Sequence, residues 1–495
     1  MDRPHPPSKK GLPKRHVLAP STPVHRLRFL LLGLLSATAP LAVGGDRPPN
    51  IVLILADDLG WADTAFSGSR YYETPHLDAF AASGMRFTSF YTSPNCAPTR
   101  ASLLSGQYAS RTGVYTVGSL ERGEDAARRM IPPPNQTHLP SGLPTLASTL
   151  RNAGYLTGLI GKWHLGEGSE HHPTRFGFVE TVVTTGPHKA FDTDPHDPRA
   201  EGAYLTDYLT DRAIEFVERH QDRPFFLYLA HLAVHSPYQA KPEWIERFAR
   251  RPPAGTHRDA VYAAMIASLD EAVGRLLARL DQLELSRRTV VIFASDNGGV
   301  GGYATTDAAG RRIGPTDNAP LRGGKGMLYE GGIRVPFLIR WPNVTQPGSR
   351  SAQPAIHVDL LPTLAEIART RPPTGHPIDG VSLVPILRDP NARLGRDAIY
   401  WHFPGYLEGP GRSGWRITPS GAIRAGNFKL IESFEDQRLE LYNLAEDIGE
   451  RNNLVRSLPD KTAELRAKLA AWRQDLNAAM PQPNPPAAEP ARARP

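Results

Sequence analysis

Continuous runs of hydrophobic residues recur along most of this chain, and several of them end in polar residues. The run "NIVLILADD" at 50–58 ends in two acids, as a buried parallel strand is expected to do. Similar strand-like runs lie at 155–162, 224–235, 288–297 and 335–342. Between them, helical spacing of hydrophobic residues occurs at 76–84, 143–154, 205–220, 259–283 and 357–368. This alternation predicts an α/β fold, with a large, mostly parallel sheet flanked by helices.

The hydrophobic pattern of the chain changes after residue 371. Short strand-like segments at 397–403, 421–434 and 439–444 are separated by turns, and 459–479 has the pattern of an amphipathic helix. These features predict a smaller C-terminal α+β domain, consistent with a length of 495 residues. We place four parts along the chain: a leader at 1–45, a main domain at 46–390, the small domain at 391–480, and a disordered Pro/Ala tail at 481–495.

The leader has the pattern of a secretory signal peptide. The stretch "RLRFLLLGLLSATAPLAVGG" at 26–45 has two arginines, then an apolar run, then small residues. A short membrane anchor is the alternative, but the apolar run from Phe29 to Leu35 is too short to span a bilayer comfortably. We therefore expect cleavage near 42–46 and an exported protein, periplasmic or secreted, with no stable membrane span. Its single cysteine excludes an internal disulfide.

The positive charge of the chain belongs mostly to this leader. The whole chain has a net charge of +7 and a pI near 9.4. Residues 1–44 hold seven Lys or Arg and one acid, which leaves about +1 for the rest. The main part of the chain therefore lacks the excess basic charge of a nucleic-acid-binding protein, and we exclude that class of partner.

Polar side chains follow four of the predicted strands. They are Asp57 and Asp58; Lys162 and His164; His231 and His235; and Asp296 and Asn297. Each alone has an ordinary structural explanation, such as a turn or a helix cap. All four would lie at the edge of the sheet where α/β folds bind ligands, which favours a functional site. Carboxylate and amide oxygens suit Ca²⁺ or Mg²⁺ rather than zinc or copper, and the histidines and lysines remain for proton transfer and anion binding.

The single cysteine lies in the stretch "PNCAPTRASLLSG" at 94–106. Pro98 is well placed in the first turn of a short helix. Cys96 and Arg100 are four residues apart, so they share one side of that helix start. A helix N-terminus beside an arginine is an anion-binding position. The pattern predicts a nucleophile that faces a bound anion next to a divalent cation.

The motif Cys-x-Pro-x-Arg followed by "ASLLSG" resembles that of the type I sulfatases, the arylsulfatase family, whose cysteine is oxidised to Cα-formylglycine. The stretches "GYLTGLIGKWHLG" (154–166), "SDNGG" (295–299) and "LRGGKGMLYEGGIRVP" (321–336) are also similar to that family. The resemblance covers roughly residues 49–390 and implies an alkaline-phosphatase-like fold. Thr99 and Ser105 differ from the residues common in the family but keep a hydroxyl group.

The resemblance implies a role for each matched position. It implies one Ca²⁺ per chain, bound by Asp57, Asp58, Asp296 and Asn297, with modified Cys96 adding an oxygen. It implies that a formylglycine-generating enzyme is a partner during maturation. One hydroxyl of the hydrated aldehyde would attack sulfur with help from Asp296, and the second would later expel sulfate. The other matched residues also have implied roles. Arg100 would steady the hydrate, and Lys162 and Lys325 would bind sulfate. His164 would deprotonate the second hydroxyl, and His235 would protonate the leaving alcohol.

Five further residues are weaker candidates. Arg322 would support either the sulfate pocket or the structure, and His188 would touch the sugar or aryl group. The pair His171 and His172 would cap a loop, and His231 follows the same strand as His235. Substrate choice is expected to lie in polar, Gly/Pro-rich segments at 108–142, 166–204, 300–320 and 403–420.

Three functions remain open at this level. The first is a sulfatase acting on a sulfated carbohydrate, either small molecule or polysaccharide, or on an aryl sulfate. The second is a phosphomonoester or phosphonate hydrolase of the same superfamily. The third is a binding protein without activity, which is disfavoured because every catalytic position is filled. The close match of "GKWHLG" and "RGGKG" to sulfatases favours the first over the second.

Overall fold

The computed structural model describes residues 47–301, 314–409 and 414–485. The predicted signal segment lies outside the described residues, so its cleavage and the export of the protein stay predictions. Among the described helices, none has both the length and the apolar character needed to cross a membrane. The proposed domain boundary after residue 390 also stays a prediction.

A ten-stranded sheet forms the centre of the large part of the fold. Its middle strand, β1 (Asn50–Ala56), pairs in parallel with β7 (Phe225–Ala230) on one side and β8 (Thr289–Ser295) on the other. The order across the sheet is β10 (Ser349–Ser351), β2 (Met85–Tyr91), β9 (Arg334–Arg340), β8, β1, β7, β4 (Leu156–Gly161), β5 (Glu180–Thr185) and β6 (Asp192–Asp194), with β11 (Ala355–Ile356) beside β2. Among these described strands, only β9 and β6 run antiparallel to their neighbours: β9 pairs with β2 and β8, and β6 pairs with β5. The predicted large, mostly parallel sheet is confirmed.

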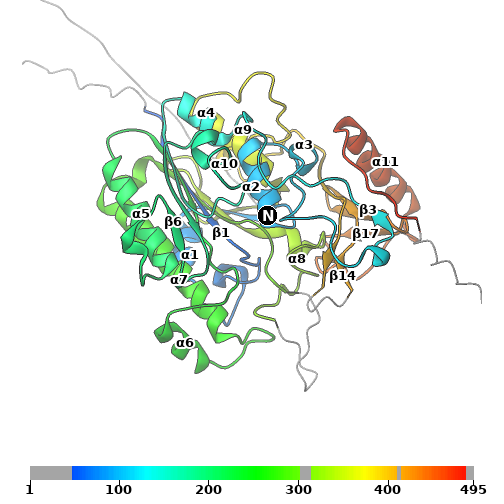
Figure 1. Cartoon of the computed structure of the whole chain (residues 1–495), viewed down its shortest axis with the longest axis horizontal. Helices are drawn as coiled ribbons and strands as arrows, with labels where there is room; N and C mark the ends of the chain where they lie inside the picture. Colours follow the sequence, from blue (N-terminus) through cyan, green and yellow to red (C-terminus); the bar gives the residue numbers. More distant parts are fainter. Residues whose placement is uncertain (1–46, 302–313, 410–413, 486–495) are drawn as a thin grey trace, which may run out of the picture. The chain divides into compact units, whose positions relative to one another are not determined.

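Helices cover both faces of this sheet (Figure 1). One face is covered by α1 (Pro75–Ser83), α5 (Leu205–Arg219) and α7 (Ala260–Gln282), and the other by α2 (Cys96–Ser105), α4 (Leu146–Asn152), α9 (Leu360–Ile367) and α10 (Val384–Arg388). Strand β1 shows why such a run is apolar on both sides. Val52 and Ile54 pack into one core, while Ile51 and Leu53 pack into the other. Both faces of the strand are therefore buried.

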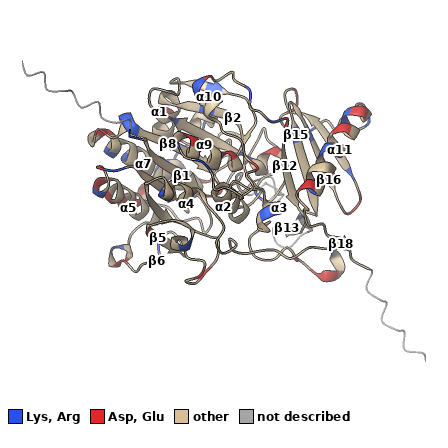
Figure 2. Ribbon diagram, turned by 90° about the horizontal axis from the view of Figure 1, so that it is seen from above, with Lys and Arg blue, Asp and Glu red and all other residues tan. Residues whose placement is uncertain are grey.

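A separate four-stranded antiparallel sheet lies in the C-terminal part of the chain. It is built from β12 (Ala398–Phe403), β15 (Ser420–Ala425), β16 (Phe428–Ser433) and β17 (Leu439–Asn443), in that order. Helix α11 (Pro459–Asp475) packs on it through Leu465 and Leu469. The other face of α11 carries residues of both charge signs (Figure 2). The remaining described α-helices and strands are α3 (Ala109–Thr112), α6 (Pro242–Ala249), α8 (Glu330–Ile333), and the two-stranded pairs β13 (Leu407–Glu408) with β14 (Trp415–Ile417) and β3 (Met130–Ile131) with β18 (Gln482–Pro483).

The last pair corrects the predicted tail. We expected residues 481–495 to be disordered, but β18 pairs with β3, and the backbone N–H of Asn484 donates to the carbonyl of Arg129 at 2.9 Å. The prediction is therefore wrong for residues 481–485. The Pro/Ala composition hid a strand because a short edge pairing needs only a few backbone hydrogen bonds and tolerates proline. Residues 486–495 lie outside the described part of the chain.

A buried ionic cluster joins the small sheet to the segment that follows Lys325. Lys429 on β16 donates to Glu330 at the start of α8 (2.9 Å) and to Glu450 (2.8 Å). The side chains of Lys429 and of both glutamates are fully buried. Because an unpaired charge at this depth is costly, the cluster fixes where α8 and the loop before it lie relative to β16.

Candidate active site

The predicted polar residues meet at one edge of the large sheet. Because β1, β4, β7 and β8 run in parallel, their carboxyl ends lie side by side. Asp57 and Asp58 follow β1, Asp296 and Asn297 follow β8, and all four are at most 1% exposed. Lys162 directly follows β4, and the segment with His235 follows β7. Every strand-end residue predicted from the sequence is therefore found at this edge.

Cys96 is the first residue of α2, and every residue of that helix is buried. Its sulfur lies within 4.8 Å of carboxylate oxygens of Asp57 and Asp296. Burial raises the pKa of the Cys96 thiol, even though Lys162 and Lys325 act in the opposite direction. The unmodified thiol is thus held neutral, and a neutral thiol is a poor nucleophile.

Arg100 lies one helical turn after Cys96 and is completely buried. Its Nε and Nη2 atoms donate to Oδ2 of Asp296 at 3.0 and 2.7 Å, and its Nη1 donates to the carbonyl of Lys162 at 2.9 Å. Nη2 also lies 3.4 Å from Oδ2 of Asp57. The guanidinium therefore ties the ends of β1, β4 and β8 to the start of α2.

Two lysines pair with the two acids that follow β1. The Nζ atom of Lys162 contacts Oδ2 of Asp57, and the Nζ atom of Lys325 lies 2.7 Å from Oδ1 of Asp58. Burial on its own would raise the pKa of Asp57, but Lys162, His235 and Arg100 together hold this pKa far below its usual value. Asp57 is therefore ionised over the whole working range of pH.

The oxygens at this edge fit a cation. Within the described part of the chain, Oδ1 of Asp57 and Oδ1 of Asn297 are buried and accept no hydrogen bond. Buried oxygens of this kind normally have a donor. The amide nitrogen of Asn297 donates to Oδ1 of Asp58 at 2.8 Å. A hard cation such as Ca²⁺ or Mg²⁺ is the partner that such oxygens prefer.

Two histidines lie beside these groups in different environments. His164 has a positive φ of 61° and a buried Nδ1 that has no hydrogen-bond partner among the described residues. Burial, with Lys162 and Arg100 nearby, lowers the pKa of His164 to about 3, so it is a neutral base at neutral pH. His235 is partly exposed, with its Nε2 at 3.8 Å from Oδ2 of Asp58 and its Nδ1 donating to the carbonyl of Ser236 at 2.5 Å.

The structure separates the weaker candidates. Arg322 donates to the hydroxyl of Tyr442 (2.9 Å) and to the carbonyl of Glu450 (3.1 Å), so its contacts are structural. His188 is fully buried, and the expectation that it touches the sugar or aryl group is wrong. The sequence does not reveal this burial, because a histidine in a variable loop is usually exposed.

The other three histidines have distinct places. His172 caps the turn at Pro173–Phe176 by accepting a hydrogen bond from the backbone of Thr174 (3.4 Å), as expected. The ring of His171 lies beside that of His138, with 4.1 Å between centroids and a tilt of 31° between the rings. His231 is fully buried, with no hydrogen-bond partner for either ring nitrogen among the described residues, and burial lowers its pKa to about 3.

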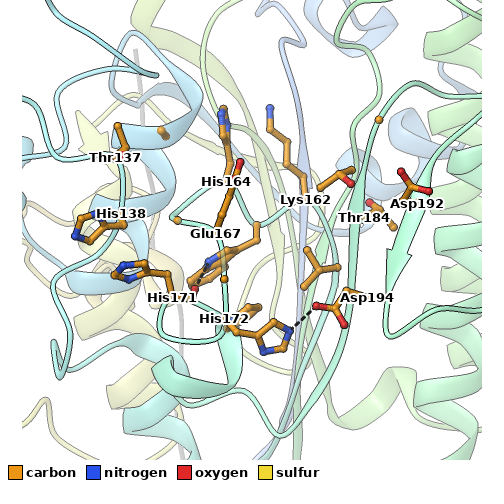
Figure 3. Close-up of a pocket in the computed structure, with 18 of the residues that line it drawn as sticks. Thr137, His138, Lys162, His164, Glu167, His171, His172, Thr184, Asp192 and Asp194 are labelled. Carbon is orange, nitrogen blue, oxygen red and sulfur yellow. Dashed lines mark hydrogen bonds and ion pairs between the residues drawn. The ribbon is translucent and has the colours of Figure 1, made fainter.

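A cavity of about 1380 Å³ opens from Lys162 and His164 (Figure 3). One wall carries His138 and His171, and the other carries Thr184, Asp192 and Asp194. Nε2 of His172 lies 3.6 Å from Oδ2 of Asp194, which links the two walls. The wall residues fall within segments that the sequence predicts to choose the substrate. Among them, only His171 and His172 are also individual candidates from the sequence.

Comparison with known proteins places these motifs in a family. The profile of the family described as Sulfatase matches residues 49–370. A second profile, described as the C-terminal part of N-sulphoglucosamine sulphohydrolase, matches residues 324–478. The first match includes all the residues gathered at the sheet edge, and the second includes the small antiparallel sheet.

Three similar proteins illustrate the relationship. A protein named Sulfatase from Formosa agariphila is 34% identical over 91% of this chain and 93% of its own length. The N-acetylgalactosamine-6-sulfatase of Mus musculus is 34% identical over 72% of this chain and 69% of its own. The solved structure of Ps i-CgsB in complex with k-i-k-neocarrahexaose is 28% identical, with a TM-score of 0.71, over 89% of this chain and 94% of its own.

Proposed function

This chain belongs to the sulfatase family and is a sulfuric ester hydrolase, and from that premise we propose that it removes sulfate from carbohydrates by means of a formylglycine made from Cys96. We propose in addition that it binds Ca²⁺ and acts after export, cleaved from its leader near residues 42–46. The observation that carries the proposal is the convergence of Cys96, Arg100, Lys162 and Lys325 on the acids that follow β1 and β8.

Two features support the modification of Cys96. The motif Cys96-x-Pro98-x-Arg100 matches that of the family, and the thiol itself is buried and neutral, which would make it ineffective in attack on an ester. A formylglycine-generating enzyme would therefore be needed during maturation. When formed, the hydrated aldehyde supplies one hydroxyl that attacks sulfur and a second that later expels sulfate.

The residues that would hold Ca²⁺ are Asp57, Asp58, Asp296 and Asn297, with an added oxygen on modified Cys96. The unpartnered oxygens of Asp57 and Asn297 support this assignment. The ion would supply positive charge next to a sulfate oxygen. Arg100 would hold Asp296 in the position where it binds the ion and accepts the proton of the attacking hydroxyl.

The remaining residues bind the ester and move protons. Lys162 and Lys325 carry their charges at the place where sulfate oxygens would lie, so they would stabilise the negative charge that develops there. His164 is neutral and can accept a proton when sulfate is expelled. His235 is the partly exposed histidine of the site and can donate a proton to the oxygen of the leaving alcohol.

The shape of the cavity supports a carbohydrate as the leaving group. Its volume of about 1380 Å³ is larger than the roughly 300–1,000 Å³ of ordinary small-molecule pockets. Its walls present hydroxyl, imidazole and carboxylate groups from Thr184, His171 and Asp192. Such groups pair with sugar hydroxyls. The solved complex of a similar protein with a neocarrahexaose and the similarity to an N-acetylgalactosamine-6-sulfatase agree with this class of substrate.

The test compares esters of one sugar. Purified protein, produced together with a formylglycine-generating enzyme, is assayed on sulfated mono- and oligosaccharides and on the phosphate ester of the same sugar. We expect release of sulfate with kcat/KM at least about 100-fold above that for phosphate, a ratio equal to about 3 kcal/mol in transition-state binding. A higher kcat/KM for the phosphate ester would identify a phosphomonoester hydrolase instead.

A further inference from the structure

His188 is a buried histidine that the mechanism above does not use. It lies in the turn between β5 and β6, yet its side chain reaches the segment that follows β7. Its Nε2 lies 2.8 Å from the backbone carbonyl oxygen of His235, and it is fully buried. A carbonyl can only accept, so Nε2 of His188 carries the proton and donates it.

The segment that carries His235 is held firmly at its start. The backbone N–H of His231 donates to the carbonyl of Leu55, and residues Asp57 and Ala233 are joined by a backbone hydrogen bond of 2.9 Å. The N–H of Val234 donates to the carbonyl of Asp57 at 2.6 Å. Residues 231–234 therefore continue the pairing between β7 and β1 and cannot shift independently of the sheet.

Beyond that point, the segment also contacts residues near His188 and before α5. The hydroxyl of Tyr204 donates to the carbonyl of Gln239 (3.0 Å), and the backbone N–H of Lys189 donates to the Oε1 atom of Gln239 (3.1 Å). The backbone carbonyl of His188 accepts from the N–H of Leu205, the first residue of α5. The bond from His188 to His235 thus links this anchored segment directly to the backbone of the active-site histidine.

We propose that His188 is a positioning residue, which orients the imidazole of His235 toward the leaving-group oxygen by fixing the His235 carbonyl; this rests on the role of His235 in the proposed function. The backbone of His235 is fixed at its carbonyl by His188 and at its N–H by the carbonyl of Leu232 (2.8 Å). Loss of the first bond leaves a carbonyl without its donor and frees rotation around His235. Small displacements of a catalytic group are costly, since about 1 Å can reduce the rate about 100-fold.

Three substitutions separate the hydrogen bond from mere packing. His188→Leu keeps much of the volume and removes the donor. His188→Gln places an amide nitrogen at the same number of bonds from Cβ as Nε2 and keeps the donor. Lys189→Ala changes the exposed neighbouring side chain, while the backbone N–H of Lys189 remains. On a sugar sulfate we expect kcat/KM to fall about 10- to 100-fold for His188→Leu, and to stay within about 3-fold of wild type for His188→Gln and Lys189→Ala.

A double-mutant cycle with His235→Ala tests whether His188 acts through His235. If it does, His188→Leu lowers kcat/KM in the wild-type background but changes it less than about 2-fold when His235 is already alanine. An undiminished effect in the His235→Ala background, or a His188→Gln variant as poor as His188→Leu, would overturn the proposal. If the leucine variant does not accumulate in folded form, His188→Asn replaces it, since its amide is one bond too short to reach the carbonyl.

The leaving group separates this inference from the proposed function. If His235 is the general acid, His235→Ala damages a sugar sulfate much more than nitrophenyl sulfate, because nitrophenolate leaves without a proton. His188→Leu should show the same bias. Equal losses on both substrates for His235→Ala would contradict the acid role of His235, while the cycle would still decide whether His188 positions it.

Discussion

Arg100 donates two hydrogen bonds, at 3.0 and 2.7 Å, to a single oxygen of Asp296. Both side chains are completely buried, and Asp57 lies 3.4 Å from the same guanidinium. The other oxygen of Asp296 accepts from the backbone N–H of Asp58 at 3.3 Å. Arg100 therefore fixes the geometry of the acids that are proposed to hold Ca²⁺, in addition to offsetting their charge.

The first prediction concerns the planar shape of the Arg100 guanidinium. Arg100→Lys keeps the charge but cannot donate through a planar fork, so we expect kcat/KM to fall at least about 100-fold. The matched control is Arg175→Lys, an exposed arginine at the rim of the cavity, which should stay within about 3-fold of wild type. Steady-state kinetics and thermal unfolding of both variants check this. Full activity in folded Arg100→Lys protein would show that only the charge matters.

The second prediction concerns the metal. Asp57→Asn should lose bound Ca²⁺, because the remaining ligands balance less of its charge. Asp192→Asn removes an exposed carboxylate of the cavity wall and should keep it. Elemental analysis after dialysis, and the shift of Tm on adding Ca²⁺, give readouts that do not depend on activity. Equal Ca²⁺ content in the two variants would disprove the ligand assignment.

The third prediction concerns pH and stability. Burial lowers the pKa of His357 to about 3, and its Nε2 lies 3.1 Å from the hydroxyl of Ser93 in the segment that leads to Cys96. Because the folded pKa lies below the ordinary value of 6.5, the unfolded chain binds a proton first as the pH falls. Stability from this group is complete above about pH 6.5 and is lost progressively down to about pH 3. Between about pH 7.5 and 5, wild type should lose about 2 kcal/mol more unfolding free energy than His357→Gln.

Urea unfolding at both pH values measures this difference. Titrations of the other groups are common to both proteins and largely cancel. Parallel loss in wild type and His357→Gln would mean that His357 can take up a proton in the folded protein.

The fourth prediction concerns the buried cluster between the two sheets. Lys429→Met removes the cation that pairs with Glu450 and leaves Glu330 with Arg334 at 3.1 Å, and we expect a loss of about 3–5 kcal/mol in unfolding free energy. Lys468→Met, on the exposed face of α11, removes a partner of Glu464 and should cost less than about 1 kcal/mol. Denaturant unfolding of the two variants compares them directly. Similar small losses would mean that the glutamates are protonated or hydrated without Lys429.

Part of this architecture could be predicted from the sequence because it depends on local patterns. The run that forms β1 is apolar from Ile51 to Ala56, because the side chains on both of its faces are buried, and it ends at Asp57 in the proposed site. In contrast, β2 reads "MRFTSFY", with polar residues interspersed, and its local pattern does not reveal the strand. Its position is set by pairing with β9, which is distant in sequence.

Long-range contacts also explain what remained hidden at the site. A family motif points to Lys325, but nothing local indicates that it reaches Asp58, 267 residues away. The loop position of His188 predicts an exposed side chain, but His188 is buried. Its burial accompanies a contact with the carbonyl of His235, which is distant in sequence, so the local sequence pattern does not indicate it. The pairing of His172 with Asp194 across the cavity is likewise a product of the folded chain.

The fifth prediction tests the central claim, that the working nucleophile is made from Cys96. Protein produced with and without a formylglycine-generating enzyme should contain different fractions of aldehyde in the peptide that carries Cys96, measured by mass spectrometry and by reaction with a hydrazide. We expect kcat per molecule of protein to rise in proportion to the aldehyde fraction, and to vanish for Cys96→Ala. Full turnover in protein whose Cys96 is entirely free thiol would contradict the account.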